Sequence, residues 1–507
     1  MSEKLSWRSK ISFGLGAFGK DLVYAIVSTY LMKYLTDVRL VDTAFVGVLF
    51  AVARIWDAVN DTAMGYIVDN TRTKWGKFRP WILIGTLLNA VILILLYMNV
   101  DISGIKYAVY IGFMYVLWGM TYTIMDIPYW SMVPALTNNE NERNQISAIP
   151  RLFASFAWLI VGSLGLYIVK GLGNGDELKG YAWFAVIISI IFVITSTITV
   201  LNTKERVVAT AGTGEKTSIK KMLKVLFKND QVLVVLMIAL FFNLAYQLSN
   251  SFALYYFEYV CGVKEELFSV YTAVAGIAQI GALFAFPLLR IKINKTILFI
   301  LACLFPVVGF ALLFLAGYVA PQSMVFVGFC SAIVNIGIGF MLVIITVILS
   351  EVVDYGEYKF KSRNESVLFS TQTFVVKFAG AFSALISGVG LKLIGFVANE
   401  TQDKGTIIGM RVIMIILPAV FSLLCLIIYL KKYKLKDKFY KEIMDELKVR
   451  KEEENLAEEN NMAVEGVANE IYAGSEPVNT QAEHDGYQNF VENTQKIPED
   501  KEDKNDN

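Results

Sequence analysis

Twelve long apolar segments constrain the fold of this chain more than any other feature of its sequence. A helix needs about 20 residues to cross the hydrocarbon core of a bilayer, and the segments reach that length. The runs are too long for strands and lack strict alternation, so we expect helices, as lipid requires of an open chain. Their approximate spans are 11–36, 43–68, 80–99, 106–137, 147–170, 181–201, 231–262, 267–289, 296–317, 323–351, 366–398 and 407–430.

Composition and loop lengths extend this prediction. Of the 507 residues, 55% are hydrophobic and only 18% are charged, whereas about a quarter of a soluble protein is charged. The longest polar loop divides six segments from six, which favours two packed bundles. We therefore predict an all-α, polytopic protein of the cell membrane with bundles at residues 1–201 and 231–430, joined by a cytoplasmic loop at 202–230.

Charge is distributed unevenly along the chain. The net charge is +1, but residues 431–507 carry −8 and the remainder carries +9. Lys and Arg concentrate in alternate loops, which predicts that both termini lie in the cytoplasm. No basic patch lies apart from this pattern, so nucleic-acid binding is not expected.

Residues 431–507 are expected to form a cytoplasmic tail. Phe439, Ile443 and Leu447 are spaced to share one face of a short amphipathic helix. Beyond it, 458–507 has too few apolar residues to fold alone and is expected to be disordered. Docking of a cytoplasmic regulator on this acidic tail is left open.

Enzyme chemistry has little support in the sequence. Gly14, Gly16 and Gly19 match a dinucleotide-binding pattern, but no strand precedes them and they lie in a membrane segment. Small residues that let helices pack closely are the better interpretation. We find no nucleophile–base pair and no cofactor motif, so we expect neither catalysis nor a cofactor.

Ionisable residues inside the apolar segments are the strongest functional signal. Each costs about 2.5–3.5 kcal/mol at the centre of a membrane helix on insertion scales, so the groups must face one another or water. Four acids and four bases stand out: Lys20, Asp21, Arg54, Asp57, Asp61, Asp126, Arg151 and Lys377.

The second segment carries an acidic face. Arg54, Asp57 and Asp61 are spaced i, i+3 and i+7, which places them on one side of a helix with Asn60 at its edge. Two carboxylates one turn apart, with an amide oxygen, suit a small hard cation such as Na⁺, or a proton. The alternative is a cluster of salt bridges that joins the helices.

The fourth segment carries a mixed polar and aromatic face. Tyr122, Asp126 and Trp130 are spaced i, i+4 and i+8, with Thr123 one turn before Asp126. Carboxylates and bases bind sugar hydroxyls, while an aromatic ring covers the apolar face of a sugar. Aromatic residues at this spacing also serve packing or interfacial anchoring. The residues expected to complete the substrate site are Lys20, Asp21, Arg151, Thr373 and Lys377.

Several of these stretches resemble the glycoside–pentoside–hexuronide:cation symporters, a family of the major facilitator superfamily. The resemblance covers about residues 1–430 and rests on Gly16-Ala-Phe-Gly-Lys-Asp21, Ala53-Arg-Ile-Trp-Asp-Ala-Val-Asn-Asp61, Trp75-Gly-Lys-Phe-Arg-Pro-Trp-Ile-Leu-Ile-Gly-Thr86, Trp118-Gly-Met-Thr-Tyr-Thr-Ile-Met-Asp-Ile-Pro128 and Asp354-Tyr-Gly-Glu-Tyr-Lys359. It implies a symporter that moves a galactoside, such as melibiose, together with Na⁺, Li⁺ or H⁺. The implied mechanism is alternating access.

The resemblance also implies roles for individual residues. Asp57 and Asp61 would bind Na⁺, helped by Asn60 and Thr123. The implied sugar contacts are Lys20, Asp21, Asp126, Trp130 and Arg151, with Tyr122 nearby and Lys377 bridging the halves.

Two arginines in the loops, and two other functions, also have to be considered. Arg143 and Arg363 stand at repeated positions after the fourth and tenth segments. We expect them to join a coupling network with Arg54, although loop cations also simply set topology. The same fold would also serve proton-coupled transport of a pentoside or glucuronide. From a different functional class, the chain would be a sugar sensor that does not transport.

Overall fold

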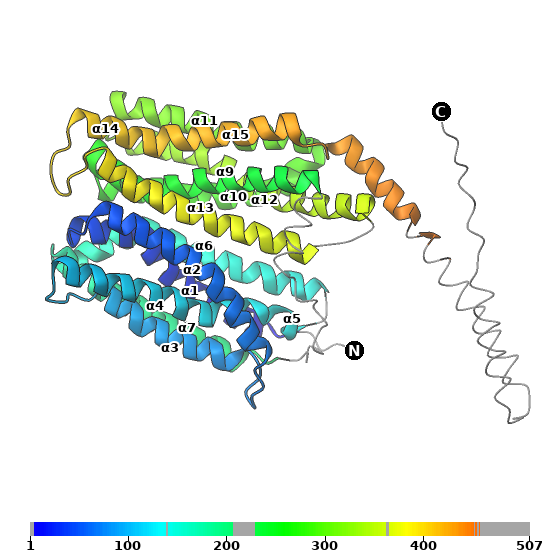
Figure 1. Ribbon diagram of the computed structural model, residues 1–507, viewed down its shortest axis with the longest axis horizontal. Coiled ribbons are helices and arrows are strands. Elements are labelled where there is room, and N and C mark those ends of the chain that lie inside the picture. The colour runs from blue at the N-terminus through cyan, green and yellow to red at the C-terminus, as the bar shows by residue number, and fades with distance from the viewer. Residues whose placement is uncertain are drawn as a thin grey trace, which may run out of the picture. The chain divides into compact units, whose positions relative to one another are not determined.

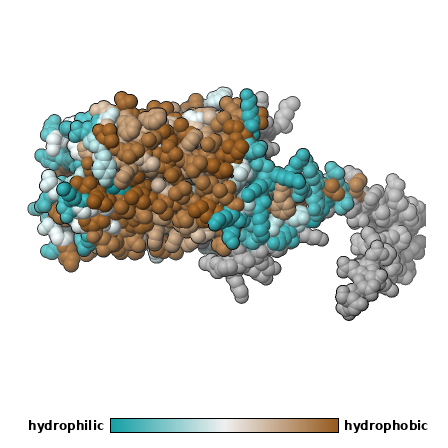
Figure 2. Space-filling view, turned by 90° about the horizontal axis from the view of Figure 1, so that it is seen from above, coloured by the Kyte–Doolittle hydropathy of each residue, from teal (hydrophilic) through white to brown (hydrophobic). Residues whose placement is uncertain are grey.

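The computed structural model describes residues 5–137, 140–205, 229–360, 365–450, 452, 453 and 456, and twelve helices in these ranges are long and apolar enough to span a membrane. The predicted all-α, twelve-helix fold is therefore confirmed. Two groups of helices lie side by side with their long axes roughly parallel (Figure 1). On the face shown in Figure 2, apolar residues form a broad band and hydrophilic residues gather at both ends of the helices.

The N-terminal group contains the first six spanning helices. Its elements are α1 (Trp7–Lys33), the π-helical turn η1 (Tyr34–Val38), α2 (Thr43–Asp69), α3 (Arg79–Tyr97), α4 (Gly104–Ser131), the short α5 (Val133–Leu136), α6 (Glu140–Gly173) and α7 (Glu177–Asn202). Helix α1 packs against α6 and α7, and α4 packs against α2 and α3.

The C-terminal group contains the other six. Its elements are α9 (Asp230–Tyr255), the π-helical turn η2 (Tyr256–Val260), α10 (Glu265–Lys292), α11 (Lys295–Val319), α12 (Met324–Phe360), α13 (Glu365–Leu393), α14 (Lys404–Arg411), the π-helical turn η3 (Val412–Ile416) and α15 (Leu417–Lys432). Between the groups, α2 contacts α13 and α6 contacts α10.

We call the end of the body where α1 begins and α15 finishes the terminal end, and the opposite end the far end. Polar side chains cap several helices where they leave the apolar band. At the far end, the Asp42 carboxylate accepts a hydrogen bond from the Phe45 amide at 3.0 Å and begins α2. At the terminal end, Glu205 accepts from the amides of Lys77 and Phe78 and so closes the start of α3.

The glycines of the pseudo-nucleotide motif lie where helices cross. A Cβ added to Gly16 would stand 2.5 Å from Thr199 Oγ1, and one added to Gly14 would stand 2.8 Å from the Phe153 ring. The absence of side chains lets α1 approach α6 and α7, which is the packing interpretation made from the sequence.

Beyond Lys441 the chain forms a separate unit. Residues 442–450 are helical. The predicted disordered segment 458–507 and most of the predicted middle loop, 206–228, lie outside the described residues.

Candidate transport site

A buried lysine on α1 organises the first polar cluster. Lys20 is 4% exposed, and its ammonium lies 2.9 Å from Asp126 Oδ1 and 3.1 Å from Asp21 Oδ2. It also donates a hydrogen bond to the Tyr122 hydroxyl at 3.5 Å and lies 5.2 Å from the centre of the Trp130 ring. These five residues form the Lys20 cluster. With two acids and one base, it is formally negative by one charge.

Trp158 on α6 adds a contact that the sequence reasoning missed. Its indole Nε1–H donates to Asp21 Oδ1 at 3.2 Å. Because Lys20 lies against the other oxygen, both oxygens of the Asp21 carboxylate are held. The membrane-charge pattern does not flag Trp158, because a lone tryptophan in an apolar segment carries no spacing signal.

A second cluster joins α2, α4 and α13. Asp57 pairs with Arg54 at 3.5 Å, and Asp61 accepts a hydrogen bond from Thr123 Oγ1 at 3.0 Å. Asp61 also forms an ion pair with Lys377, which comes from the C-terminal group. These five residues form the Asp61 cluster. The two acids predicted as a cation site thus each have a separate basic partner.

Local packing explains how Asp57 reaches the interior. It faces Gly119 on α4, where an added Cβ would stand 2.6 Å from Asp57 Oδ1. The missing side chain makes room for the carboxylate. One turn along α2, the Asn60 amide nitrogen is buried and has no hydrogen-bond partner among the described residues. A buried N–H donor of this kind is costly unless it meets an acceptor, such as the oxygen of a water or ligand.

Among the other predicted residues, Arg151 has no described side-chain contact with either cluster. Arg151 is exposed, and its guanidinium makes no hydrogen bond or ion pair with another described residue. Thr373 is exposed one turn before Lys377 on α13. The side chain of Arg143 and the whole of Arg363 lie outside the described part of the chain.

The far end holds a third polar cluster, which the sequence reasoning did not select. Lys33 on α1 pairs with Asp37 in η1 and with Glu258 in η2, and the Tyr259 hydroxyl donates to Asp37. These four residues form the far-end network, and they come from both groups of helices. The signal was present as a base and an acid one turn apart, Lys33 and Asp37, at the end of an apolar run.

Two further pairs connect the groups near this network. Lys264 Nζ lies 2.6 Å from Glu177 Oε1, and Lys392 Nζ lies 2.7 Å from Asp42 Oδ2. Burial opposes the charge on Lys264, but its acidic neighbours, chiefly Glu258 and then Glu177, raise the pKa of its ammonium. The far end is therefore held together by several charges drawn from both groups.

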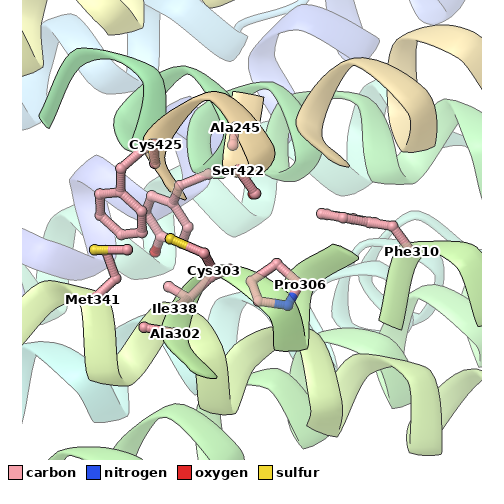
Figure 3. Close-up of a pocket in the computed structure, with 11 residues that line it drawn as sticks. Ala245, Ala302, Cys303, Pro306, Phe310, Ile338, Met341, Ser422 and Cys425 are labelled. Atoms are coloured by element: carbon pink, nitrogen blue, oxygen red, sulfur yellow. The ribbon is translucent and has the colours of Figure 1, made fainter. Parts of the chain in front are cut away.

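A small apolar cavity lies in the C-terminal group, between α9, α11, α12 and α15 (Figure 3). Ala302, Cys303, Pro306 and Met341 line it together with Cys425. No residue of the Lys20 or Asp61 cluster is among its lining residues. Its walls offer little to a sugar or a cation, so we do not assign it to the transport site.

The fold and its paired membrane charges define a class: a secondary transporter of the major facilitator type. The sequence matches the family described as MFS/sugar transport protein over residues 12–437. The chain therefore belongs to this family.

Similar proteins agree with this assignment. A lactose permease of Lactobacillus delbrueckii subsp. bulgaricus is 30% identical over 460 residues, covering 87% of this chain and 72% of the permease. An isoprimeverose transporter of Lactiplantibacillus pentosus is 30% identical, covering 78% of this chain and 82% of the transporter. The crystal structure of a D-xylose-proton symporter superposes with a TM-score of 0.63 at 14% identity, covering 84% of this chain and 98% of that one. The first two similarities agree with membership of the MFS/sugar transport family, and the third shows the fold.

Proposed function

We propose that this symporter couples uptake of a galactoside, such as melibiose, to the inward movement of Na⁺, with Li⁺ or H⁺ as alternative coupling ions. The observation that carries the proposal is the pair of neighbouring clusters on α1, α2 and α4. One presents two carboxylates and a threonine hydroxyl, and the other presents carboxylates, an ammonium and aromatic rings. The first set suits a hard cation and the second suits a polyol.

The cation step starts from acids that are already paired. Na⁺ at Asp57 and Asp61 competes with the ammonium of Lys377 and the guanidinium of Arg54, because each partner neutralises the same carboxylate charge. Thr123 and Asn60 supply neutral oxygens that a cation accepts as ligands. Release of Lys377 removes an ion pair between the two groups of helices. Cation binding therefore changes the free-energy difference between conformations in which the two groups are arranged differently.

The sugar step uses the excess negative charge of the Lys20 cluster. Asp126 is 27% exposed at its side chain, so its carboxylate can accept hydrogen bonds from the hydroxyls of a ligand. The Lys20 ammonium can donate to sugar oxygens in turn, while the Trp130 ring covers an apolar sugar face. A cation bound at the Asp61 cluster lowers the negative charge nearby and orders this site for the sugar.

The transport cycle follows the bundle architecture. We propose that both termini are cytoplasmic, because the basic loops lie at the terminal end. The far end then faces outwards, and the contacts between Lys33, Asp37, Glu258 and Tyr259 close it in this structure. Rocking of the two groups about the mid-depth site opens each end in turn. No cofactor is needed beyond the coupling ion.

A second substrate class has some support. The chain is similar to an isoprimeverose transporter and, at 28% identity, to a glucuronide carrier protein homolog of Escherichia coli. Glucuronides carry a carboxylate, which the net negative Lys20 cluster would repel. The charge balance therefore favours an uncharged glycoside over a glucuronide. For a proton-coupled carrier, Na⁺ at fixed pH should leave sugar affinity unchanged.

Uptake by purified protein in liposomes tests the proposal. Asp61→Cys removes the carboxylate shared by Thr123 and Lys377, and should abolish Na⁺-driven accumulation of melibiose. Asp101→Asn, at an exposed loop acid, is the matched control and should transport normally. Accumulation against a gradient by Asp61→Cys would refute the cation assignment.

Counterflow of labelled melibiose separates a transporter from a sensor. A transporter exchanges external labelled sugar for unlabelled sugar trapped inside the liposome. We expect exchange in wild type and its loss in Asp126→Cys, which removes an acceptor from the Lys20 cluster. Binding without exchange in wild type would support the sensor instead.

A further inference from the structure

Tyr24 on α1 lies between the two clusters. Its ring centre is 5.3 Å from that of Tyr122, in the Lys20 cluster, and 6.0 Å from that of Trp158, the donor to Asp21. The Arg54 guanidinium also lies 5.3 Å from the Tyr24 ring centre. The ring therefore contacts both the residues that hold the sugar-side acid and the base that pairs with Asp57.

Contacts between a cation and a ring, and between two rings, are both energetically favourable. A guanidinium within about 6 Å of an aromatic ring is attracted to the ring face. Ring pairs at 4.5–7 Å also favour particular offsets and tilts, and Tyr24 makes tilted contacts with Tyr122 and Trp158 at 46° and 59°. A shift of Arg54 therefore changes the preferred position of Tyr24, and with it the rings beside Asp21.

We propose that Tyr24 is the positioning residue that couples the cation site to the sugar site. The inference rests on the function proposed above. Na⁺ at Asp57 weakens the hold of that carboxylate on Arg54, whose attraction to the Tyr24 ring then dominates. The ring settles towards the guanidinium, and Trp158 and Tyr122 follow it. The Asp21 carboxylate and the Lys20 ammonium are thereby fixed for the sugar.

A competing route runs through the backbone of α4. Thr123 binds Asp61 and stands one turn before Asp126, so α4 itself touches both sites. If this route carries the coupling, removal of the Tyr24 ring leaves the coupling intact. The two routes therefore make opposite predictions for one substitution.

The experiment measures binding of melibiose with and without Na⁺, and of Na⁺ with and without melibiose, by calorimetry on the purified full chain. The variants are Tyr24→Leu, which removes the ring, and Tyr24→Phe, which keeps it. In wild type the two ligands should tighten each other by one common factor, within the roughly 5–150-fold range typical of coupled sites. In Tyr24→Leu this factor should fall to within about twofold of one, while each ligand alone binds within about threefold of wild type. Tyr24→Phe should retain most of the coupling.

The possible outcomes test the role of Tyr24 and the proposed function separately. Coupling retained in Tyr24→Leu overturns the role of Tyr24 and leaves the proposed function standing. Coupling lost in Tyr24→Phe as well overturns the role of the ring. An absence of coupling in wild type overturns the proposed function, and this inference with it. If Tyr24→Leu does not fold, Tyr24→Met replaces it with the same expected result, because an unbranched apolar side chain fills similar space without a ring.

Discussion

Reversing the charge of Lys264 should open the far end. This residue precedes α10 in the C-terminal group, and its ammonium lies 2.6 Å from Glu177 at the start of α7 in the N-terminal group. It also lies 3.7 Å from Glu258, which belongs to its own group. Of the two ion pairs of Lys264, only the one with Glu177 is broken when the groups separate at this end.

The size of the effect follows from that distinction. The Lys264 side chain is 15% exposed and that of Glu177 is 42% exposed, so water screens the pair and places it near the top of the range for surface ion pairs, about 1 kcal/mol. Lys264→Glu removes this attraction and adds a repulsion of similar size. The closed far end therefore loses about 2 kcal/mol, which changes the ratio of closed to open molecules about 30-fold.

Spin-label distance measurements across the far end provide the assay. Labels at Ile105 and Val325, which are 83% and 85% exposed at the starts of α4 and α12, report the separation of the groups. Lys264→Glu should shift the distance distribution towards longer values. The added substitution Glu177→Lys should restore it, because the pair is re-formed with opposite polarity.

The matched control is the more exposed pair of Lys392 and Asp42, whose side chains are 58% and 50% exposed. Lys392→Glu should produce less than half the shift, because screening is stronger there. Neighbouring acids raise the pKa of Lys264, so its charge, and the closure that depends on it, should be constant up to its usual pKa of 10.5 and lost only above that. An unchanged distance distribution in Lys264→Glu would refute the reasoning.

Two further predictions concern packing and buried charge. Gly119→Ala places a Cβ 2.6 Å from Asp57 Oδ1 and should weaken Na⁺ binding about tenfold in a binding titration. The control is Gly112→Ala on the same helix, where the added Cβ meets its nearest atom at 3.7 Å. This variant should leave Na⁺ affinity unchanged. Glu351→Ala leaves the ammonium of Lys295 buried without its 2.5 Å partner. The free energy of unfolding in detergent should fall by about 3–5 kcal/mol. An equally large loss in the double variant Lys295→Met/Glu351→Leu would contradict this explanation.

The helices could be predicted from sequence because membrane crossing imposes a length and an apolar composition that few other structures need. The largest difference between a predicted and an observed helix boundary is in the tenth span. We expected it to end at residue 351, but α12 continues to Phe360. There the polar residues make contacts outside the apolar band: the Asp354 carboxylate accepts from Tyr440 at 2.7 Å, and Lys359 donates to Asp230 at 3.3 Å. Such partners are distant in sequence and cannot be read from local composition.

The sequence indicated most members of the two clusters but not how they pair. Spacing placed Asp57 and Asp61 on one face of a helix, yet it could not show that Arg54 and Lys377 each pair with one of them. Pairing depends on which helices meet at a given depth. Trp158 was missed for the same reason, because only the packing of α6 against α1 brings its indole to Asp21.

The far-end network shows a further limit. It depends on the π-helical turns η1 and η2, which follow α1 and α9, the first helices of the two groups. Each turn carries an acid, Asp37 or Glu258, next to the other group of helices. A single extra residue in a helical turn leaves no clear trace in hydropathy, although such turns often occur at functional positions.

The central claim is that a cation site and a sugar site occupy adjacent clusters and bind cooperatively. The most direct test is the reciprocity of binding in the unmodified protein. The affinity for melibiose should rise on addition of Na⁺, and the affinity for Na⁺ should rise by the same factor on addition of melibiose, because both report one coupling free energy. Melibiose binding that is equally tight with and without Na⁺ at fixed pH would contradict the account.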